Sequence, residues 1–367
     1  MLIKPSKYFV FFYTVLLLTI SFSLKAQKDS IQKKIKIQLL PVLTHSVETG
    51  WATGALLSST FRLKTKDTLT RTSGMQALLL YTFRKQFVGA INGAVYFPHE
   101  KYIANYQFSF SHFPDKFWGL GNNSPDSAEE PYTFEQAYVY LHLLRNIGSD
   151  FFIGALYEYQ NLFKVDFLKD GLFDKQNVAG RYGYIISGIG ASFTFDDRNN
   201  AFSPDRGNFA QFSFNHFDRV FGSDYYYTNY VIDIRKFWKI YRNNIIAFQL
   251  YNFINTGNEI PLRSLASLGG AYRMRGYYDG RYKDKNEMIL QAEDRMHLIG
   301  RFGAVVFAGL GDVAHTPFNY QLNELKYSFG AGMRFALNKK EKLNLRLDYG
   351  FAKDGNSGFY FQLGEAF

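Results

Sequence analysis

Apolar and polar residues alternate along most of this chain, whereas helical periodicity is scarce. In the segment 343–349, leucine or tyrosine occupies every second position, and Asn344, Arg346 and Asp348 occupy the positions between them. Successive side chains of a β-strand point to opposite faces, so this pattern predicts strands with one apolar and one polar face. The same alternation recurs at 106–113, 226–235 and 327–337.

Charged residues lie well inside these predicted strands. Asp233 and Arg235 fall on the polar face of 226–235, and Arg334 falls on that of 327–337. In a soluble β-sandwich the polar face would meet water, whereas in a membrane barrel the apolar face meets lipid and the polar face lines the lumen. Phe, Tyr and Trp make up 19% of the chain, and aromatic girdles are typical of membrane barrels. Both observations favour the barrel.

The fold predicted is an all-β, transmembrane, antiparallel β-barrel of about 16 strands, an even number as in other single-chain bacterial barrels. Pro41 lies inside the first strand, where it cannot donate a ladder hydrogen bond and belongs on an edge. The long connection 255–285 falls on the extracellular side. The predicted strands are 36–45, 52–63, 73–83, 87–97, 101–113, 133–143, 150–160, 181–195, 207–217, 228–238, 243–254, 286–297, 302–310, 326–336, 342–350 and 357–366.

The first residues have a different composition. Lys4 and Lys7 precede an uncharged run over 8–24, which ends at Lys25 and Ala26. This pattern predicts a secretory signal peptide over 1–26, with an uncleaved membrane anchor as the alternative. Residues 27–35 then form a short periplasmic segment before the outer-membrane β-barrel, 36–367. No later run reaches the roughly 20 apolar residues that a transmembrane helix needs.

Charge and cysteine usage narrow the partners. The chain contains no cysteine, so a disulfide scaffold and a lipid-modified cysteine are excluded. Its formal charge is +10, and without the three lysines of 1–26 it has 39 basic and 32 acidic residues, or +7. This charge suits anionic lipid head groups or acidic partners, although solvated loops and lumen charges explain it equally well. No compact basic patch indicates nucleic acid.

The sequence shows no catalytic chemistry. It has no Gly-x-Ser-x-Gly elbow. His112 has Ser111 beside it, but neighbours in a strand point to opposite faces. The seven histidines are scattered without the spacing of metal ligands. We therefore expect no enzyme activity, no metal and no cofactor.

Four segments occur in a characteristic order. Phe-Asp-Asp-Arg-Asn spans 195–199, Gly-Gly-Ala-Tyr-Arg-Met-Arg-Gly-Tyr spans 269–277, Glu-Asp-Arg spans 293–295, and a terminal strand ends at Phe367. With five strands after the Arg-Gly-Tyr loop, the set resembles the BamA/TamA family of outer-membrane barrels, also called the bacterial surface antigen family. The resemblance covers 36–367 and implies location in the outer membrane of a double-membrane, Gram-negative bacterium.

The resemblance implies that the loop 255–285 folds into the lumen and that its arginine pairs with acidic residues of the wall. Arg275 would be that arginine and Glu293 its partner, because guanidinium and carboxylate form strong charge-assisted pairs. Gly276 would permit a positive φ or a close approach, and Tyr277 would pack against the wall. An exposed turn with incidental charges is the alternative.

The chain departs from the family pattern at one acidic position. Where the family often has an acid in the strand after the glutamate strand, this chain has Gly309. We expect Asp312 to substitute for it from nearby. Together with Arg273 and Arg295, Asp312 would form a secondary lock of the loop.

The resemblance also implies a role for the segment 196–207. Asp196, Asp197 and Arg198, followed by Pro204 and Gly207, match the family's periplasmic turn. An architectural role is expected because acidic residues cap turn amides and proline fixes a bend. Partner docking is the alternative.

The terminal strand resembles the signal by which the barrel assembly machinery recognises barrels for insertion. Phe359, Phe361, Leu363 and Phe367 are expected to share one face. Pro41 would weaken the seam between the first and last strands. An opened seam exposes edges that can pair with an incoming strand.

The expected function is assistance in the insertion or passage of proteins, or lipids, at the outer membrane. Outer-membrane lipid, protein substrates and a periplasmic accessory protein are the expected partners. The periplasmic delivery modules of BamA and TamA have no counterpart in this sequence, so a barrel-only member is expected. The alternative is a passive pore, a receptor or a structural protein.

Overall fold

The computed structural model describes residues 36–63, 70–241, 244–339 and 342–367. The predicted signal peptide, 1–26, and the segment 27–35 lie outside the described residues. Within the described ranges, no helix is long and apolar enough to cross a membrane.

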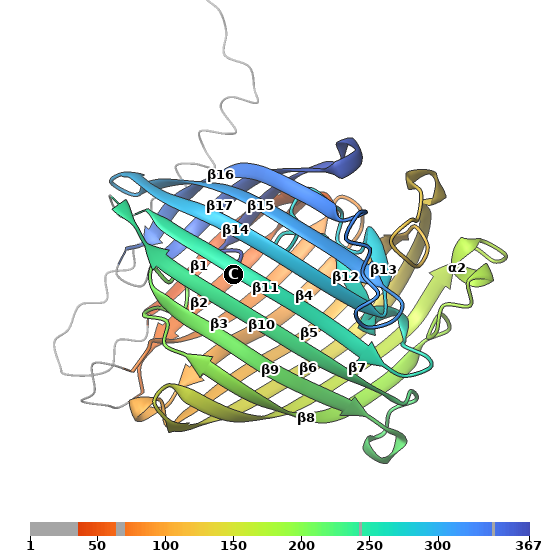
Figure 1. The fold of residues 1–367 in the computed structure, drawn as a ribbon, viewed down its shortest axis with the longest axis horizontal. Helices are drawn as coiled ribbons and strands as arrows, with labels where there is room; N and C mark the ends of the chain where they lie inside the picture. The colour runs from red at the N-terminus through yellow and green to blue at the C-terminus, as the bar shows by residue number, and fades with distance from the viewer. Residues whose placement is uncertain (1–35, 64–69, 242–243, 340–341) are drawn as a thin grey trace, which may run out of the picture.

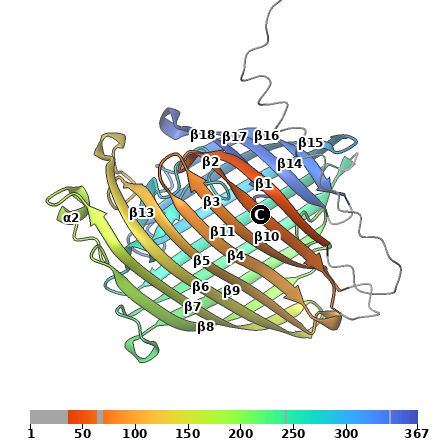
Figure 2. The same ribbon diagram turned by 180° about the vertical axis from the view of Figure 1, so that it is seen from behind.

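In the described part of the chain, sixteen strands form one antiparallel sheet that curls into a nearly closed barrel (Figure 1, Figure 2). Each strand pairs with its neighbours in chain order, so the predicted fold is confirmed. The barrel strands are β1 (Lys36–Ser46), β2 (Gly50–Phe61), β3 (Ser73–Thr82), β4 (Phe87–Tyr96), β5 (Tyr102–Phe117), β6 (Glu130–Gly148), β7 (Phe151–Phe167), β8 (Tyr184–Asp196), β9 (Gly207–Phe217), β10 (Tyr227–Lys239), β11 (Ile245–Thr256), β14 (Asn286–Ile299), β15 (Phe302–Ala314), β16 (Lys326–Asn338), β17 (Leu343–Ala352) and β18 (Ser357–Leu363).

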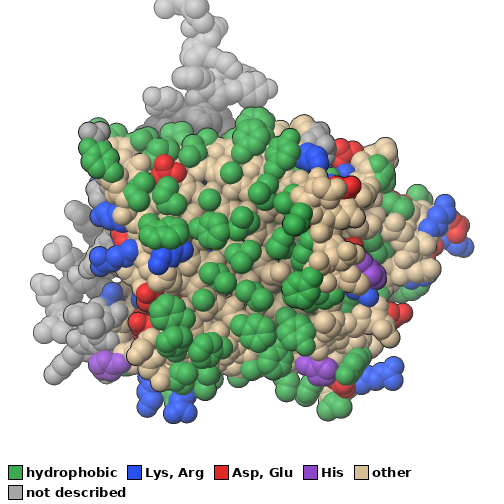
Figure 3. Space-filling view, in the orientation of Figure 1, with side chains coloured by type: hydrophobic (Ala, Val, Ile, Leu, Met, Phe, Trp, Pro, Cys, Tyr) green, Lys and Arg blue, Asp and Glu red, His purple; other side chains and the backbone are tan. Residues whose placement is uncertain are grey.

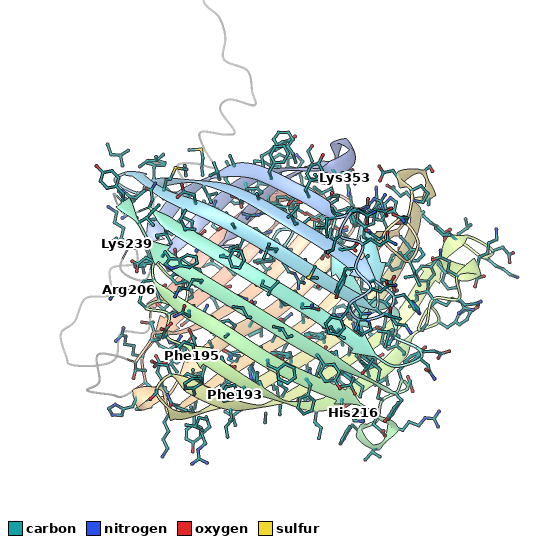
Figure 4. The ribbon with its side chains drawn as sticks, in the orientation of Figure 1. Phe193, Phe195, Arg206, His216, Lys239 and Lys353 are labelled. Atoms are coloured by element: carbon teal, nitrogen blue, oxygen red, sulfur yellow. The ribbon has the colours of Figure 1, made fainter. Side chains whose placement is uncertain are left out.

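The end at which β1 begins and β18 ends is called the periplasmic end here, following the predicted topology. Figure 4 shows Arg206 and Lys239 at this end and Lys353 at the opposite, extracellular end. The link from β7 to β8 contains a short helix, α2 (Leu172–Lys175). Short 3-10 segments occur at Pro98–Glu100, Asp126–Ala128, Arg219–Phe221, Leu262–Ser264 and Lys353–Gly355.

The alternation of the sequence becomes the two faces of the wall. Phe193, Phe212 and Phe214 point outward and are 38–48% exposed, within a broad apolar surface (Figure 3). On the inner face, Gln291 donates to Gln249 at 2.7 Å, and Gln249 donates to Asp233 at 2.9 Å. An apolar outside and a hydrogen-bonded polar inside are what a lipid-embedded barrel requires.

On the extracellular side, β5, β6 and β7 extend beyond the predicted limits 113, 133 and 160, to residues 117, 130 and 167. Pro114, Asp115 and Lys116 break the apolar alternation, yet the backbone pairing continues, with Lys116 opposite Pro131. The added length carries an apolar cap on the extracellular side. The buried members of this cap are Phe117, Tyr132, Phe134, Leu162, Phe173, Val178, Tyr184, Ile186, Phe217, Tyr227, Ile260 and Leu262.

The loop between β11 and β14 contains a small sheet that the sequence did not indicate. β12 (Ala266–Leu268) pairs antiparallel with β13 (Tyr282–Asp284). Three residues are too few to show a periodicity of two, which is why this pair escaped the sequence pattern. The small sheet brackets 269–281 and holds that segment inside the barrel.

The terminal strand is shorter than predicted and ends at Leu363. Gly364 has φ +87°, which turns the chain away from the strand direction. Phe367 therefore does not share a face with Phe359 and Phe361, and that prediction is wrong. Its ring packs against Phe237 of β10, with ring centroids 6.4 Å apart. Figure 1 and Figure 2 view opposite sides and both place this end within the barrel outline.

The seam between β1 and β18 is the weakest junction of the wall. Within the described residues, no backbone ladder joins these two strands, whereas every other neighbouring pair of the sheet has one. The Thr44 hydroxyl donates to the carbonyl of Phe361 at 2.7 Å. Pro41 lies in β1 opposite Ala55 of β2, so the proline occupies an edge strand, as its missing N–H requires.

Candidate functional site: the lumen loop and its ion pairs

The lumen loop, residues 257–285, enters the barrel from the extracellular end. Its tip needs glycine for two reasons. Gly276 has φ +117°, a conformation that residues with a side chain rarely adopt. A Cβ at this position would also lie 2.8 Å from the carbonyl carbon of Phe351 on β17. The tip therefore lies directly against the wall.

Arg275 is the centre of the site, with 1% of its surface exposed. Its Nη2 donates to Glu293 Oε1 of β14, and its Nη1 donates to Asp348 Oδ2 of β17 at 2.5 Å. The guanidinium carbon lies 3.6 Å from the ring centroid of Phe307 on β15. A charge buried this deeply is tolerated only when it is paired and hydrogen-bonded, and here three strands supply its partners.

The ion pairs continue around the inner wall. Arg295 donates to the second oxygen of Glu293 at 2.7 Å. Arg334 donates to the second oxygen of Asp348 at 2.5 Å and to Glu365 at 2.8 Å. Glu293 and Asp348 thus each have one arginine partner from the wall and one, Arg275, from the loop, while Glu365 joins the terminal segment to Arg334. The network fastens the loop to β14–β17.

Asp348, not Asp312, is the second acid of the site, which corrects the prediction. Asp312 accepts hydrogen bonds from the backbone N–H groups of Val313 at 2.9 Å and Gln321 at 2.7 Å, near the extracellular end. Gly309 instead leaves room for Met274, because a Cβ there would lie 3.1 Å from the Met274 sulfur. The sequence already placed Asp348 on the polar, inward face of its alternating strand, and this pattern could have identified it as a partner of Arg275.

The other arginine of the motif pairs elsewhere. Arg273 Nη1 lies 3.2 Å from Glu287 Oε1, and its guanidinium lies 4.2 Å from the centroid of the Tyr251 ring. Of the predicted secondary lock, Arg295 therefore joins the Glu293 network, while Arg273 forms a separate contact nearer the extracellular end of β14.

The tip of the loop also touches both sides of the seam. The Gly276 N–H donates to the Tyr360 hydroxyl of β18 at 2.9 Å, and that hydroxyl donates to the Tyr277 carbonyl at 3.1 Å. The Asp279 N–H donates to Glu48 Oε1, in the turn between β1 and β2, at 2.9 Å. The loop therefore bridges β18 and the β1–β2 hairpin, which have no ladder of their own.

A second set of contacts fixes the loop to the far wall. Asp115 of β5 accepts hydrogen bonds from Tyr132 and Tyr278, each at 2.8 Å, and its Oδ2 lies 4.0 Å from Lys283 Nζ. Burial lowers the pKa of Lys283, and the Asp115 carboxylate opposes that shift. The sequence pattern missed these residues because Asp115 and Lys283 lie outside the alternating segments.

Residues 68–367 match the family model described as the Omp85 superfamily domain. The chain belongs to the Omp85 superfamily. Its fold is similar to solved barrels of other proteins. Against BamA from Haemophilus ducreyi lacking POTRA domains 1–3, the TM-score is 0.57 at 11% identity, over 95% of this chain and 78% of that one.

Two further structures resemble this Omp85 chain. CdiB from Acinetobacter baumannii gives a TM-score of 0.56 at 12% identity, over 90% of this chain and 65% of that one. CdiB from Escherichia coli gives 0.57 at 10% identity, over 91% and 67%. At these identities the likeness concerns the fold alone. No curated protein sequence matches the chain.

The predicted turn motif of this Omp85 barrel lies at the periplasmic end, between β8 and β9. Arg198 donates to Asp196 at 2.7 Å, and Asp197 accepts a hydrogen bond from the Asn208 N–H. Gly207 has φ +106°, and a Cβ there would lie 2.7 Å from the Asp197 carbonyl oxygen. Pro204 is buried within the same turn.

A polar chamber of about 550 Å³ remains beside the loop, lined mainly by β5–β11. Amide and hydroxyl side chains dominate its surface. The loop therefore fills the lumen of this Omp85 barrel on the β14–β18 side and leaves the chamber on the β5–β11 side. The polar lining residues include Gln107, Ser109, Gln136, Tyr138, Glu158, Gln160, Gln211, Ser213, Asn215, Asn229 and Asp233.

Proposed function

We propose that this Omp85 barrel lies in the outer membrane of a Gram-negative bacterium and assists the insertion or passage of proteins there. The observation that carries the proposal is the buried Arg275 contact with Glu293 and Asp348. In a pore for free diffusion, a loop ion-paired to the inner wall would obstruct the path of the solute. A barrel that works through its wall benefits from a plugged lumen, because the membrane stays sealed while the seam changes.

The seam supplies the working surface in this proposal. β1 and β18 have unpaired edges, and the Thr44 hydroxyl bond to Phe361 spans the gap between them. Exposed strand edges recruit other strands through backbone hydrogen bonds. A protein segment in extended form, or a lipid that enters the gap, is the substrate class this surface suits. A periplasmic accessory protein would deliver it.

The family match and the fold both support this role, but neither identifies a substrate. The apolar outer face supports contact with outer-membrane lipid. The terminal strand, β18, is proposed to guide insertion of this barrel by the barrel assembly machinery. The proposed work involves no covalent chemistry.

Single-channel conductance of the purified protein tests the proposal. The wild type is expected to give small, fluctuating currents, and Arg275→Ala or Glu293→Ala is expected to enlarge them. Arg275→Lys is the matched control, because it keeps the charge and loses the planar fork that contacts two carboxylates. A large, steady wild-type current unaffected by these changes would indicate a passive pore.

A cellular assay tests the assembly role itself. Cells depleted of the protein are expected to accumulate unfolded outer-membrane proteins, detected by their loss of heat-modifiable migration. A cross-link between cysteines placed at positions 44 and 361 is expected to block rescue, and its reduction should restore rescue. Rescue that is equally good with a closed seam would remove the seam from the mechanism.

A further inference from the structure

The turn between β8 and β9, residues 197–206, reaches two distant parts of the periplasmic rim. Its flanking residue Asp196 pairs with Arg71, in the connection between β2 and β3. Its own Asp205 pairs with Lys342, in the connection between β16 and β17. Six strands, β3 to β8, separate the turn from the first contact, and six barrel strands, β9 to β16, separate it from the second. Neither contact is between neighbours, so both must cross the mouth of the barrel.

One end of the turn has a buried anchor. Arg71 Nη1 lies 2.5 Å from Asp196 Oδ2, and Arg71 also donates to Glu100 at 2.6 Å through Nη2. Arg198 pairs with the other oxygen of Asp196. These four side chains are at most 16% exposed. Buried and doubly paired charges are hard to separate, because breaking one pair leaves a charge without water or a partner.

The middle of the turn packs on the inner wall. Phe202 lies over β3, since a Cβ at Gly74 would meet its ring at 3.3 Å. Ala201 packs against the buried cluster of Tyr96, Ile103, Leu144 and Phe152. The turn therefore lies against the inner face of β3–β7, on the periplasmic side of the polar chamber.

The other end of the turn has a more accessible attachment. Lys342 Nζ lies 2.5 Å from Asp205 Oδ2, and the two side chains are 34% and 23% exposed. The Asn199 amide holds the other oxygen of Asp205 at 2.7 Å, so the carboxylate is already oriented. An ion pair that is partly exposed to water is weaker than a buried one and is more strongly screened by salt. The two ends of the turn thus differ in strength.

We infer that the turn 197–206 is a lid over the periplasmic mouth, hinged at Arg71–Asp196 and latched at Asp205–Lys342. Release of the latch alone lets the lid swing away and connects the chamber to the periplasm. The lumen then has two independent closures, the loop at Arg275 toward the outside and the lid toward the periplasm. The lid does not depend on the proposed role in protein assembly.

The absence of cysteine from the chain permits a direct test. Ser213 is buried and lines the chamber, so Ser213→Cys reports access to it. In nanodiscs the wild-type lid is expected to slow labelling by a sulfonated maleimide. Asp205→Lys and Lys342→Asp are each expected to raise the rate by about fivefold, which corresponds to about 1 kcal/mol for a solvent-accessible ion pair. High salt should also raise the wild-type rate.

The charge swap makes the test specific. Asp205→Lys combined with Lys342→Asp is expected to restore slow labelling, because the pair re-forms with its signs exchanged. Lys339→Asp, the same charge change three residues away, is the matched control and should leave the rate unchanged. Heat-modifiable migration confirms folding of every variant. Wild-type labelling as fast as in the single variants, or a swap that fails to restore slow labelling, overturns the lid. Neither result bears on the assembly assay.

Discussion

Replacement of Arg275 by alanine is the most informative change, because this side chain connects the loop to two strands. It removes the donors to Glu293 and Asp348 and the contact with Phe307. Breaking a buried ion pair by deleting one partner costs about 3–5 kcal/mol. Here Glu293 retains Arg295 and Asp348 retains Arg334, so neither carboxylate is left unpaired. The loss should therefore lie near the lower limit, about 3 kcal/mol.

The loop has other attachments, and these determine what the variant does. Tyr360, Glu48 and Asp115 still hold the loop, so the barrel should fold and the loop tip should become mobile. Urea unfolding in detergent, followed by tryptophan fluorescence, measures the free energy of unfolding. Conductance measures the mobility of the tip, and larger currents are expected.

A control and a coupling measurement complete this prediction. Arg301 is exposed and donates to the carbonyl oxygens of Ala336 and Leu337, near the end of β16, so Arg301→Ala should cost less than about 1 kcal/mol. Arg275→Ala and Asp348→Asn should couple by about 1–3 kcal/mol in a double-mutant cycle. If Arg275→Ala costs no more than Arg301→Ala and leaves the currents unchanged, the ion pairs do not hold the loop.

Three other changes test separate parts of the structure. Gly276→Ala combines a positive φ with a backbone clash, so it should destabilise the barrel by about 1–3 kcal/mol in the same urea assay, and an unchanged midpoint would contradict the close approach. Burial and the nearby Asp279 carboxylate raise the pKa of Glu48. The contribution of Glu48 to stability is therefore complete below its unfolded pKa and is lost as the pH rises through its folded pKa. Glu48→Gln should remove this pH dependence from the unfolding midpoint, and a pH profile identical to that of the wild type would refute the assignment. Thr44→Val removes the seam hydrogen bond, which is worth about 1 kcal/mol. Hydrogen exchange should therefore accelerate in β1 and β18, while β9 keeps its wild-type rate. If β1 and β18 exchange at the same rate in the variant and the wild type, this bond does not close the seam.

The sequence by itself determined the wall of this protein. An alternation with a period of two reveals which residues face outward, because each strand imposes it locally. It therefore predicted the strand number and most strand limits, and it assigned Arg334 and Asp348 to the inner face. Glu293 was predicted from the family resemblance instead. Where polar residues broke the pattern, at Asp115 and beyond, the same reasoning ended the strand too early.

Only the tertiary structure decided what meets across the lumen. Alternation shows which face of the sheet a residue lies on but not its position along the barrel axis. It therefore could not identify Asp348, in place of Asp312, as the second acid. It also does not show how far a turn or a terminal segment reaches inside. The inward path of Phe367 and the contacts from 197–206 to Arg71 and Lys342 depend on closure of the sheet. Closure brings together residues that are six strands apart, and no local pattern records that proximity.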